Sequence, residues 1–177
     1  MKIPFLQNSR VHLCKLDIED ISEAYLRGVN NQDLDFYTTH ALYPKNKKEL
    51  ENYLVEKQNN RDIWLGIYSA SAQTHIGNIE LFQFNNQTRS AKFAILLWDE
   101  LGKGFAREAS TLLIDHAFKS IGLNRIELGV HAENERAIKL YQSLGFIQEG
   151  ILRQAGYKGG KYFDVIHMSI LSRDYLK

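Results

Sequence analysis

The chain has 177 residues, the length of one compact domain, and its 44% apolar and 24% charged residues exclude a disordered chain. Its 22 basic and 21 acidic residues leave a formal charge of +1, which argues against binding to the phosphate backbone of nucleic acids but not against a local basic pocket. The N-terminus has no long apolar stretch, so we expect neither a signal peptide nor a membrane span.

One domain is predicted over residues 1–177, because the chain has only two prolines and no Pro-, Gly- or Ser-rich linker. The single cysteine, Cys14, excludes an intrachain disulfide and is typical of a reducing cytoplasm, where we expect the protein to reside. Cys14 lies inside a strand-like run, where a free cysteine is usually a buried filler rather than a nucleophile.

In chain order, the first predicted elements are a strand and two helices. Residues 10–16 predict the strand, and Asp17 is a candidate N-cap for a helix that runs to about Gly28. Asn46 is a candidate cap for the second helix, whose apolar residues recur at helical spacing. Between the two helices, residues 30–44 are polar and aromatic without a clear period, which predicts a loop or a broken helix.

Three strands come next, and then the pattern changes. Apolar and alternating runs predict an antiparallel meander of three strands, at residues 63–68, 75–84 and 90–98. The remaining elements are, in order, a helix from Phe105 to Gly122, a strand at 125–130, a helix capped by Asn134 and ended by Gly145, and a hairpin of strands 146–155 and 162–171. This order predicts a mixed α/β (α+β) fold with one parallel crossover.

A glycine-rich loop stands where the third strand of the meander gives way to a helix. Its sequence is Leu101-Gly102-Lys103-Gly104-Phe105-Ala106, followed by Arg107. The first turn of a helix has unpaired N–H groups and partial positive charge, and glycines let a phosphate approach the backbone closely. Lys103 and Arg107 add cationic charge. A tight turn without a ligand explains the glycines about equally well, and the loop is neither a Walker A loop nor a complete dinucleotide fingerprint.

A second motif lies in the strand and helix that follow. It reads Asn134-x-x-Ala137-x-x-x-Tyr141, and Gly145-Phe146 comes directly after it. Together with the glycine loop, this motif resembles the GNAT superfamily of N-acetyltransferases, over about residues 8–174. The final segment, with Glu149-Gly150 and Gly160-Lys161-Tyr162, is similar to the branch that contains ribosomal-protein N-terminal acetyltransferases and spermidine acetyltransferases.

The resemblance implies a GNAT-like fold: a mostly antiparallel, twisted sheet of about seven strands, helices on both faces, and two splayed parallel strands that hold acetyl-CoA. The glycine loop would bind the pyrophosphate through backbone N–H groups. The site should therefore survive one departure from the family pattern, which is Leu101 in place of the usual Gln or Arg. A second departure is Trp98, where many members carry proline.

The resemblance also assigns residues outside the loop to the cofactor. They are strand residues whose backbone would face the pantetheine arm and supply an oxyanion donor, and residues of the following helix, namely Ile95, Leu96, Leu97, Asn134, Ala137 and Lys139. Two of them have simpler explanations, because Asn134 suits a helix cap and Lys139 suits an exposed helix surface.

Tyr141 would be the general acid that protonates the leaving thiolate, although its helical spacing alone predicts a core aromatic residue. The glutamate that many relatives carry near Ala91 or Lys92, and that would be the general base, is absent. Glu80 is the candidate, directly or through a water, and an exposed strand residue is the equal alternative. Further candidates are His40, His75 and His131. The chain lacks metal-ligand spacing, so we expect no metal.

The predicted function is transfer of an acetyl group from acetyl-CoA to a primary amine, by direct attack in a ternary complex. The acceptor would be a protein N-terminus, a polyamine or an amino sugar. Its site would form from the first helices, the loop at 30–45 and the final hairpin, a surface rich in ring-bearing side chains: Tyr37, His40, Tyr43, Tyr157 and Tyr162.

Two other functions fit the sequence. One is a module that binds acyl-CoA without turnover, which Leu101 and the missing glutamate favour. The other is a regulator that binds a nucleotide through the glycine loop. For each of these functions the resemblance implies a monomer or a homodimer, and we expect neither nucleic acid nor a membrane as a partner.

Overall fold

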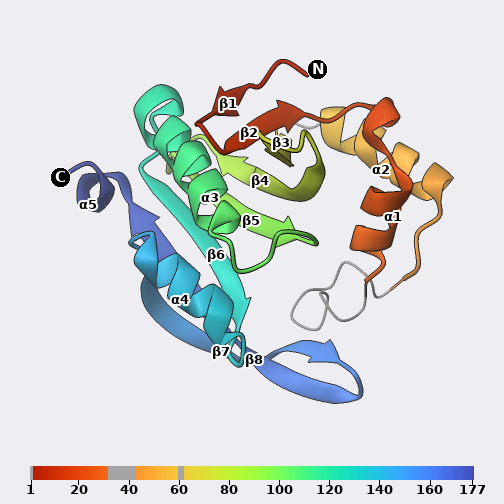
Figure 1. The fold of residues 1–177 in the computed structure, drawn as a ribbon. Coiled ribbons are helices and arrows are strands. Elements are labelled where there is room, and N and C mark those ends of the chain that lie inside the picture. The colour runs from red at the N-terminus through yellow and green to blue at the C-terminus, as the bar shows by residue number, and fades with distance from the viewer. Residues whose placement is uncertain (1, 32–42, 60–61) are drawn as a thin grey trace.

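The computed structural model describes residues 2–31, 43–59 and 62–177, and within these ranges eight strands form one sheet (Figure 1). The strands are β1 (Leu6–Gln7), β2 (Val11–Lys15), β3 (Ile63–Ser69), β4 (His75–Asn85), β5 (Ser90–Leu97), β6 (Arg125–His131), β7 (Ile147–Lys158) and β8 (Lys161–Leu171). Their order in the sheet is β1-β2-β3-β4-β5-β6-β8-β7. All neighbours are antiparallel except β5 and β6, so the predicted mixed sheet with one parallel crossover is confirmed.

The sheet has one strand more than the predicted seven. The additional strand, β1, has only two residues, too few for an alternating pattern to show in the sequence. The last hairpin is also longer than predicted, because Gly159 and Gly160 both have positive φ and form a two-residue turn. As a result, β7 ends at residue 158 rather than at the predicted 155, and β8 begins at residue 161 rather than at the predicted 162.

The helices are η1 (Ile18–Asp20), α1 (Glu23–Val29), α2 (Lys47–Asn59), α3 (Phe105–His116), η4 (Ala117–Ile121), α4 (Glu135–Ser143) and α5 (Ser172–Tyr175). The prediction of one helix over 17–28 is wrong, because the Ser22 hydroxyl accepts the Tyr25 N–H at 3.1 Å and starts a new helix after the 3-10 turn. Asn46 caps α2 as predicted, since its side chain accepts the Glu49 N–H at 3.0 Å. Most of the loop predicted at 30–44 lies outside the described residues.

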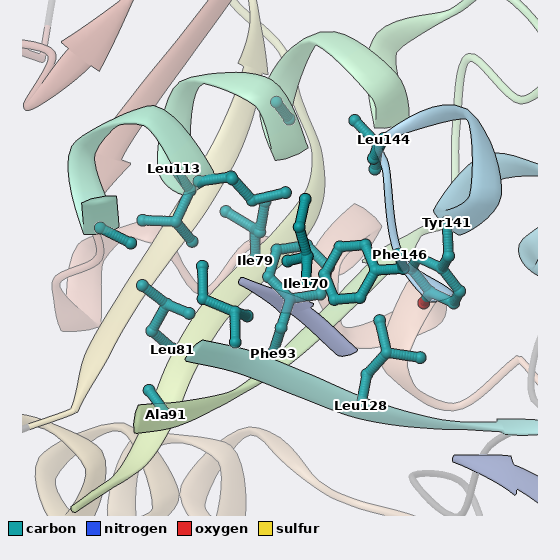
Figure 2. Close-up of a cluster of buried hydrophobic side chains, with 14 of the residues drawn as sticks. Ile79, Leu81, Ala91, Phe93, Leu113, Leu128, Tyr141, Leu144, Phe146 and Ile170 are labelled. Carbon is teal, nitrogen blue, oxygen red and sulfur yellow. The ribbon is translucent and has the colours of Figure 1, made fainter. Parts of the chain in front are cut away.

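Two hydrophobic clusters lie on opposite faces of the sheet, which confirms helices on both faces. The larger cluster joins α3 and α4 to the sheet, through residues such as Leu113, Tyr141 and Ile79 (Figure 2). The smaller cluster joins α1 and α2 to it, through residues such as Tyr25 and Leu54. Strand side chains alternate between faces, so Ile79 and Leu81 of β4 enter the larger cluster, whereas Asn78 and Glu80 line a cavity on the side of α1 and α2.

Candidate functional site

Beyond their first residues, β5 and β6 separate. The two strands pair at Ser90–Arg125, Ala91–Ile126 and Lys92–Glu127, whereas β5 continues to Leu97 and β6 to His131. The parts beyond the pairing line a cavity of about 860 Å³. A volume of this order is typical of small-molecule sites, and open strand edges offer N–H and C=O groups to an extended ligand. The splayed parallel pair implied by the resemblance is therefore present.

The glycine loop lines the same cavity and leads into α3. Gly102 and Gly104 have φ of +83° and +89°, in the left-handed region that favours glycine, and Gly104 is the N-cap of α3. A Cβ placed on Gly102 meets no described atom within 4 Å, so the space in front of this residue is open. The first N–H groups of α3 have no acceptor within the helix, which makes the loop suitable for a diphosphate.

The residues of this loop differ in whether they reach the cavity. Gly102, Gly104, Phe105, Ala106 and Arg107 all line it. Lys103 is not among the described residues that line it.

Lys103 is held elsewhere: its Nζ lies 2.6 Å from the Glu100 carboxylate, and this hydrogen bond raises the pKa of the Lys103 ammonium. A second arginine, Arg136 of α4, lines the cavity instead. The sequence pattern did not reveal Arg136, because an arginine in the first turn of a helix is common on protein surfaces.

Arg10, which the sequence did not single out, fixes the loop from the N-terminal side. Its guanidinium pairs with the Glu108 carboxylate, donates to the Lys103 carbonyl at 2.9 Å and lies 4.8 Å from the centre of the Phe105 ring. Asn8 donates to the second oxygen of Glu108 at 3.1 Å. These contacts tie the loop and the first turn of α3 to the segment between β1 and β2. No local pattern predicts them, since the partners are far apart in the chain.

Helix α4 brings three of its four candidates to the cavity. Asn134, Ala137 and Tyr141 line it, and the Asn134 Oδ1 also accepts the Ala137 N–H at 3.1 Å as the helix cap. The fourth, Lys139, lies on the exposed side of α4 with its Nζ 3.1 Å from the Glu135 carboxylate. The structure therefore does not bring Lys139 to the other candidates.

Tyr141 is a buried residue that also lines the cavity. The ring contacts Phe93 and Phe146 at centroid distances of 6.3 and 5.8 Å, and Figure 2 shows it within the larger cluster. Burial raises the pKa of the Tyr141 hydroxyl to about 12, so the group is protonated at neutral pH. A neutral phenol in this position can donate a proton to a leaving group.

The three strand candidates of β5 divide between the two faces of the sheet. Ile95 and Leu97 line the large cavity, whereas Leu96 lines a second cavity of about 180 Å³ on the side of α1 and α2. Ala94 and Ile95 line both cavities, so the two spaces border the same part of β5.

The second cavity holds Glu80 among aromatic side chains. Tyr25, Tyr53 and Trp64 line it together with Glu80, which lies directly opposite Ala94 in the register of β4 and β5. Glu80 is 8% exposed, so the alternative of an exposed strand residue is wrong. Tyr43 also lines this cavity, as its place in the predicted acceptor surface suggested.

The histidines lie in different surroundings. His75 is held away from both cavities, where its Nε2 lies 2.9 Å from the Gly77 carbonyl and 2.9 Å from the Asn78 side-chain oxygen, and burial lowers its pKa to about 4. His131 lines the large cavity and stacks on Phe163 at 3.9 Å, and burial lowers its pKa as well. His40 lies outside the described residues.

Among the described residues, two other aromatic candidates do not line the second cavity. Tyr157 and Tyr162 are exposed on the β7–β8 hairpin, with ring centroids 4.9 Å apart, and Tyr37 lies outside the described residues. Cys14 is buried, and burial raises the pKa of its thiol, which suits a packing role.

Among the described residues, no group of three His, Cys, Asp or Glu side chains is arranged to hold a metal ion. In the same part of the chain, no helix has the length and apolar character needed to cross a membrane.

Comparison with known families gives one match over most of the chain. A family model described as an acetyltransferase (GNAT) domain matches residues 10–147. The solved structure of spermidine N-acetyltransferase from Vibrio cholerae in complex with CoA and spermine is similar over 96% of this chain and 100% of that one, with 32% identity and a TM-score of 0.87.

Two curated relatives are also similar. Spermidine N(1)-acetyltransferase of Vibrio cholerae is 41% identical over 102 residues, which are 57% of this chain and 59% of the relative. Spermidine N(1)-acetyltransferase of Escherichia coli (strain K12) is 39% identical over 101 residues, which are 56% of this chain and 54% of the relative. The match thus spans little more than half the length of these two curated relatives.

Proposed function

The chain belongs to the GNAT acetyltransferase family, and from this premise we propose that it transfers the acetyl group of acetyl-CoA to a primary amine. The observation that carries the proposal is that two cavities share Ala94 and Ile95 in their linings. One cavity is lined by the glycine loop and Tyr141, and the other is lined by Glu80. Such an arrangement suits a donor and an acceptor bound at once, and alignment alone contributes up to roughly 7–11 kcal/mol to lowering a barrier.

The cofactor cavity fits acetyl-CoA in its shape and donors. The N–H groups after Gly104 and the guanidinium of Arg107 would hold the diphosphate, and Asn134 and Ala137 would contact the cofactor from α4. The open edge of β5 would receive the pantetheine arm through its backbone, and one of its N–H groups would stabilise the developing oxyanion. Acetyl-CoA supplies the activated acetyl thioester.

Two side chains would move the protons of the reaction. The Tyr141 hydroxyl, protonated at neutral pH, would donate its proton to the departing sulfur. The Glu80 carboxylate would accept a proton from the attacking amine, directly or through a water. General acid and base groups of this kind each contribute about 10²–10⁴-fold to a rate.

A polyamine is the first acceptor class that we propose. The relatives described above act on spermidine, and the structural neighbour binds spermine. A carboxylate surrounded by the rings of Tyr25, Tyr53 and Trp64 also suits an alkylammonium group, which is attracted to both. A protein N-terminus and an amino sugar are the acceptors against which a polyamine must be tested.

The remaining parts of the proposal concern the whole protein. We infer that residues 1–177 form one acetyltransferase domain, in keeping with the single sheet of the described residues. A cytoplasmic location and a monomer or homodimer without nucleic acid or membrane partners also belong to the proposal, on the basis of the single free cysteine and the near-neutral charge.

An amine panel tests the function. The protein is incubated with acetyl-CoA and, in separate reactions, spermidine, N-terminal peptides and an amino sugar on a nucleotide carrier, and the acetylated product is identified by mass spectrometry. We expect product with spermidine, and a loss of about 10²-fold or more in kcat for Tyr141→Phe. CoA affinity of this variant, measured by calorimetry, should stay unchanged, because the variant keeps the ring that packs on Phe93 and Phe146.

Other results would favour the alternative functions. Tight binding of CoA without product from any amine would point to a module that holds acyl-CoA without turnover. Stronger thermal stabilisation by ATP or NAD than by CoA would instead indicate a nucleotide-binding regulator.

A further inference from the structure

Glu80 is held by a lysine that approaches it from outside the acceptor cavity. The Lys57 Nζ lies 2.7 Å from the Glu80 Oε2, and the two side chains are only 15% and 11% exposed. Glu80 lines the cavity, whereas Lys57 is not among the described residues that line it. The Lys57 ammonium therefore contacts the Oε2 atom of the Glu80 carboxylate, and the Oε1 atom stays outside this ion pair.

The position of Lys57 is favoured by two ring contacts and by its place near the end of α2. Its Nζ lies 5.7 Å from the centre of the Tyr53 ring and 5.4 Å from the centre of the Phe82 ring. Tyr53 is one turn earlier on α2, and Phe82 is two residues from Glu80 on the same strand. Lys57 also lies in the last turn of α2, where the helix dipole favours a cation. A cation held by two rings, a carboxylate and a helix end has little freedom to leave.

We propose that Lys57 is a positioning residue of acetyl transfer, which keeps the Glu80 carboxylate ionised and directed toward the acceptor amine. This inference rests on the proposed function. A carboxylate buried among aromatic rings takes up a proton readily unless a cation is beside it, and a protonated Glu80 cannot accept a proton from the amine. An unheld carboxylate also has several rotamers, only some of which face the cavity.

Several other titratable groups lie near Lys57 and Glu80 and interact electrostatically with them. Tyr53 and Glu56 come from α2, Asp62 precedes β3, Tyr25 comes from α1, and Lys45 and Tyr43 line the cavity: these are the titratable groups that face it in the described residues. The hydrogen bond and charge of Glu80 raise the pKa of Lys57 against the opposing effect of burial, so the lysine is charged throughout the neutral range. Of these groups, Lys57 is the cation in direct contact with Glu80.

The test compares Lys57→Met and Lys57→Arg with the wild type over pH 5.5–9. In Lys57→Met we expect the acidic limb of kcat/KM for the amine to move to higher pH by about one unit or more, because the buried carboxylate has lost its cation. Lys57→Arg should return the acidic limb of kcat/KM to its wild-type pH, because arginine supplies a cation at the same position. Lys48→Met is the matched control on the same helix, since Lys48 is 77% exposed and pairs only with Glu51 at 3.4 Å among the described residues. A lysine that merely stabilises the fold would lower the rate equally at every pH, and this result would overturn the proposal.

A second measurement does not depend on turnover. Without a cation, the buried Glu80 favours its protonated form in the folded state, so stability falls as pH rises. We therefore expect the melting temperature of Lys57→Met to fall further below the wild type at pH 8 than at pH 5, and the additional change Glu80→Gln to remove the difference. Equal losses at both pH values would overturn the inference even if the enzyme is active. Absence of product from the wild type with every amine would instead count against the proposed function. The melting temperatures of the variants would still test the interaction of Lys57 with Glu80.

Discussion

At Tyr141, packing and chemistry depend on different atoms of one side chain. The ring belongs to the larger cluster, and the residue is 8% exposed, while it also lines the large cavity. Burial that fixes the ring also raises the pKa of the hydroxyl to about 12. The proposed proton donor is therefore also a residue of the core.

The pH dependence of the rate follows from this pKa. A hydroxyl with a pKa of about 12 stays protonated well above neutral pH, so we expect kcat at saturating amine and acetyl-CoA to show no fall between pH 8 and pH 10. Steady-state rates across this range measure it. A decline with a midpoint below pH 9, together with an inactive Tyr141→Phe, would show that the phenol titrates where burial should prevent it.

His75 is the centre of a buried polar group between α1 and the sheet. Its Nε2 faces two acceptors, the Gly77 carbonyl and the Asn78 side-chain oxygen, so this nitrogen carries the proton of the neutral ring. The other nitrogen, Nδ1, is buried without a hydrogen-bond partner among the described residues. Charging the ring would place a cation in this environment, and burial accordingly lowers the pKa of His75 to about 4.

Stability should therefore fall in mild acid. The folded pKa of about 4 lies below the unfolded value near 6.5, so the unfolded chain binds more protons between these limits and stability is lost as pH decreases. From pH 7 to pH 5 this linkage corresponds to a loss of roughly 2 kcal/mol. Urea unfolding at both pH values measures it, and the dependence should be weaker in His75→Gln, which keeps an N–H donor. An unchanged pH dependence in this variant would contradict the assignment.

Among single residues, the sequence predicted chemical type better than orientation. Gly102, Asn134 and Tyr141 lie at one cavity because short motifs fix both their spacing and their element. Lys103 and Lys139 were predicted at the same cavity from their charge, yet each pairs with a nearby glutamate. A long flexible side chain can turn to either side, and the choice depends on neighbours that no motif specifies.

At the scale of an element, the glycine loop depends on a backbone shape that other residues disfavour. Gly102 has φ of +83° and open space around its Cα, so an added methyl group would strain the backbone without a clash. Gly160, in the turn of the last hairpin, has φ of +80° and equally open surroundings among the described atoms. The two positions form a matched pair, and only Gly102 lines the cofactor cavity.

We predict that Gly102→Ala and Gly160→Ala reduce stability by similar amounts, about 1–2 kcal/mol each. Only Gly102→Ala should weaken CoA binding, because its methyl group stands where a diphosphate would approach the backbone. Thermal melting and calorimetric titration with CoA measure the two effects. Equal CoA affinities in both variants would mean that the loop does not hold the cofactor.

Most elements could be predicted from the sequence because their signals are local. Asn46 and Asn134 cap α2 and α4, and Gly122 ends the helical segment after α3, as their positions predicted. The first predicted helix is in fact two segments, η1 after Asp17 and α1 after Ser22. Both Asp17 and Ser22 are good N-cap residues, so the local signal does not show where the longer helix begins. Contacts between distant segments, such as Arg10 with Glu108, have no local signal.

At the scale of the whole molecule, the acceptor side and the cofactor side are joined at the end of β5. Trp98 follows this strand and stacks on Tyr25 of α1 at a centroid distance of 5.1 Å. Its Nε1 donates to the His75 carbonyl at 3.2 Å, which fixes the indole against the sheet. Trp98 thus supports the helix that lines the acceptor cavity, in a position where many relatives were expected to carry proline.

The approach of α1 to Trp98 depends on Gly28. A Cβ on this glycine would lie 2.5 Å from the indole ring, so Gly28→Ala must push α1 away from the sheet. We expect a stability loss of about 1–3 kcal/mol from this overpacking, and a rise of about tenfold in KM for the amine, which is roughly 1.4 kcal/mol. CoA affinity should change little, because Arg10 and Glu108 hold the glycine loop from the other side. Gly150→Ala is the control, since its Cβ meets no described atom within 4 Å. If Gly28→Ala weakened CoA binding as much as amine binding, the two sides of the molecule would not be separable in this way.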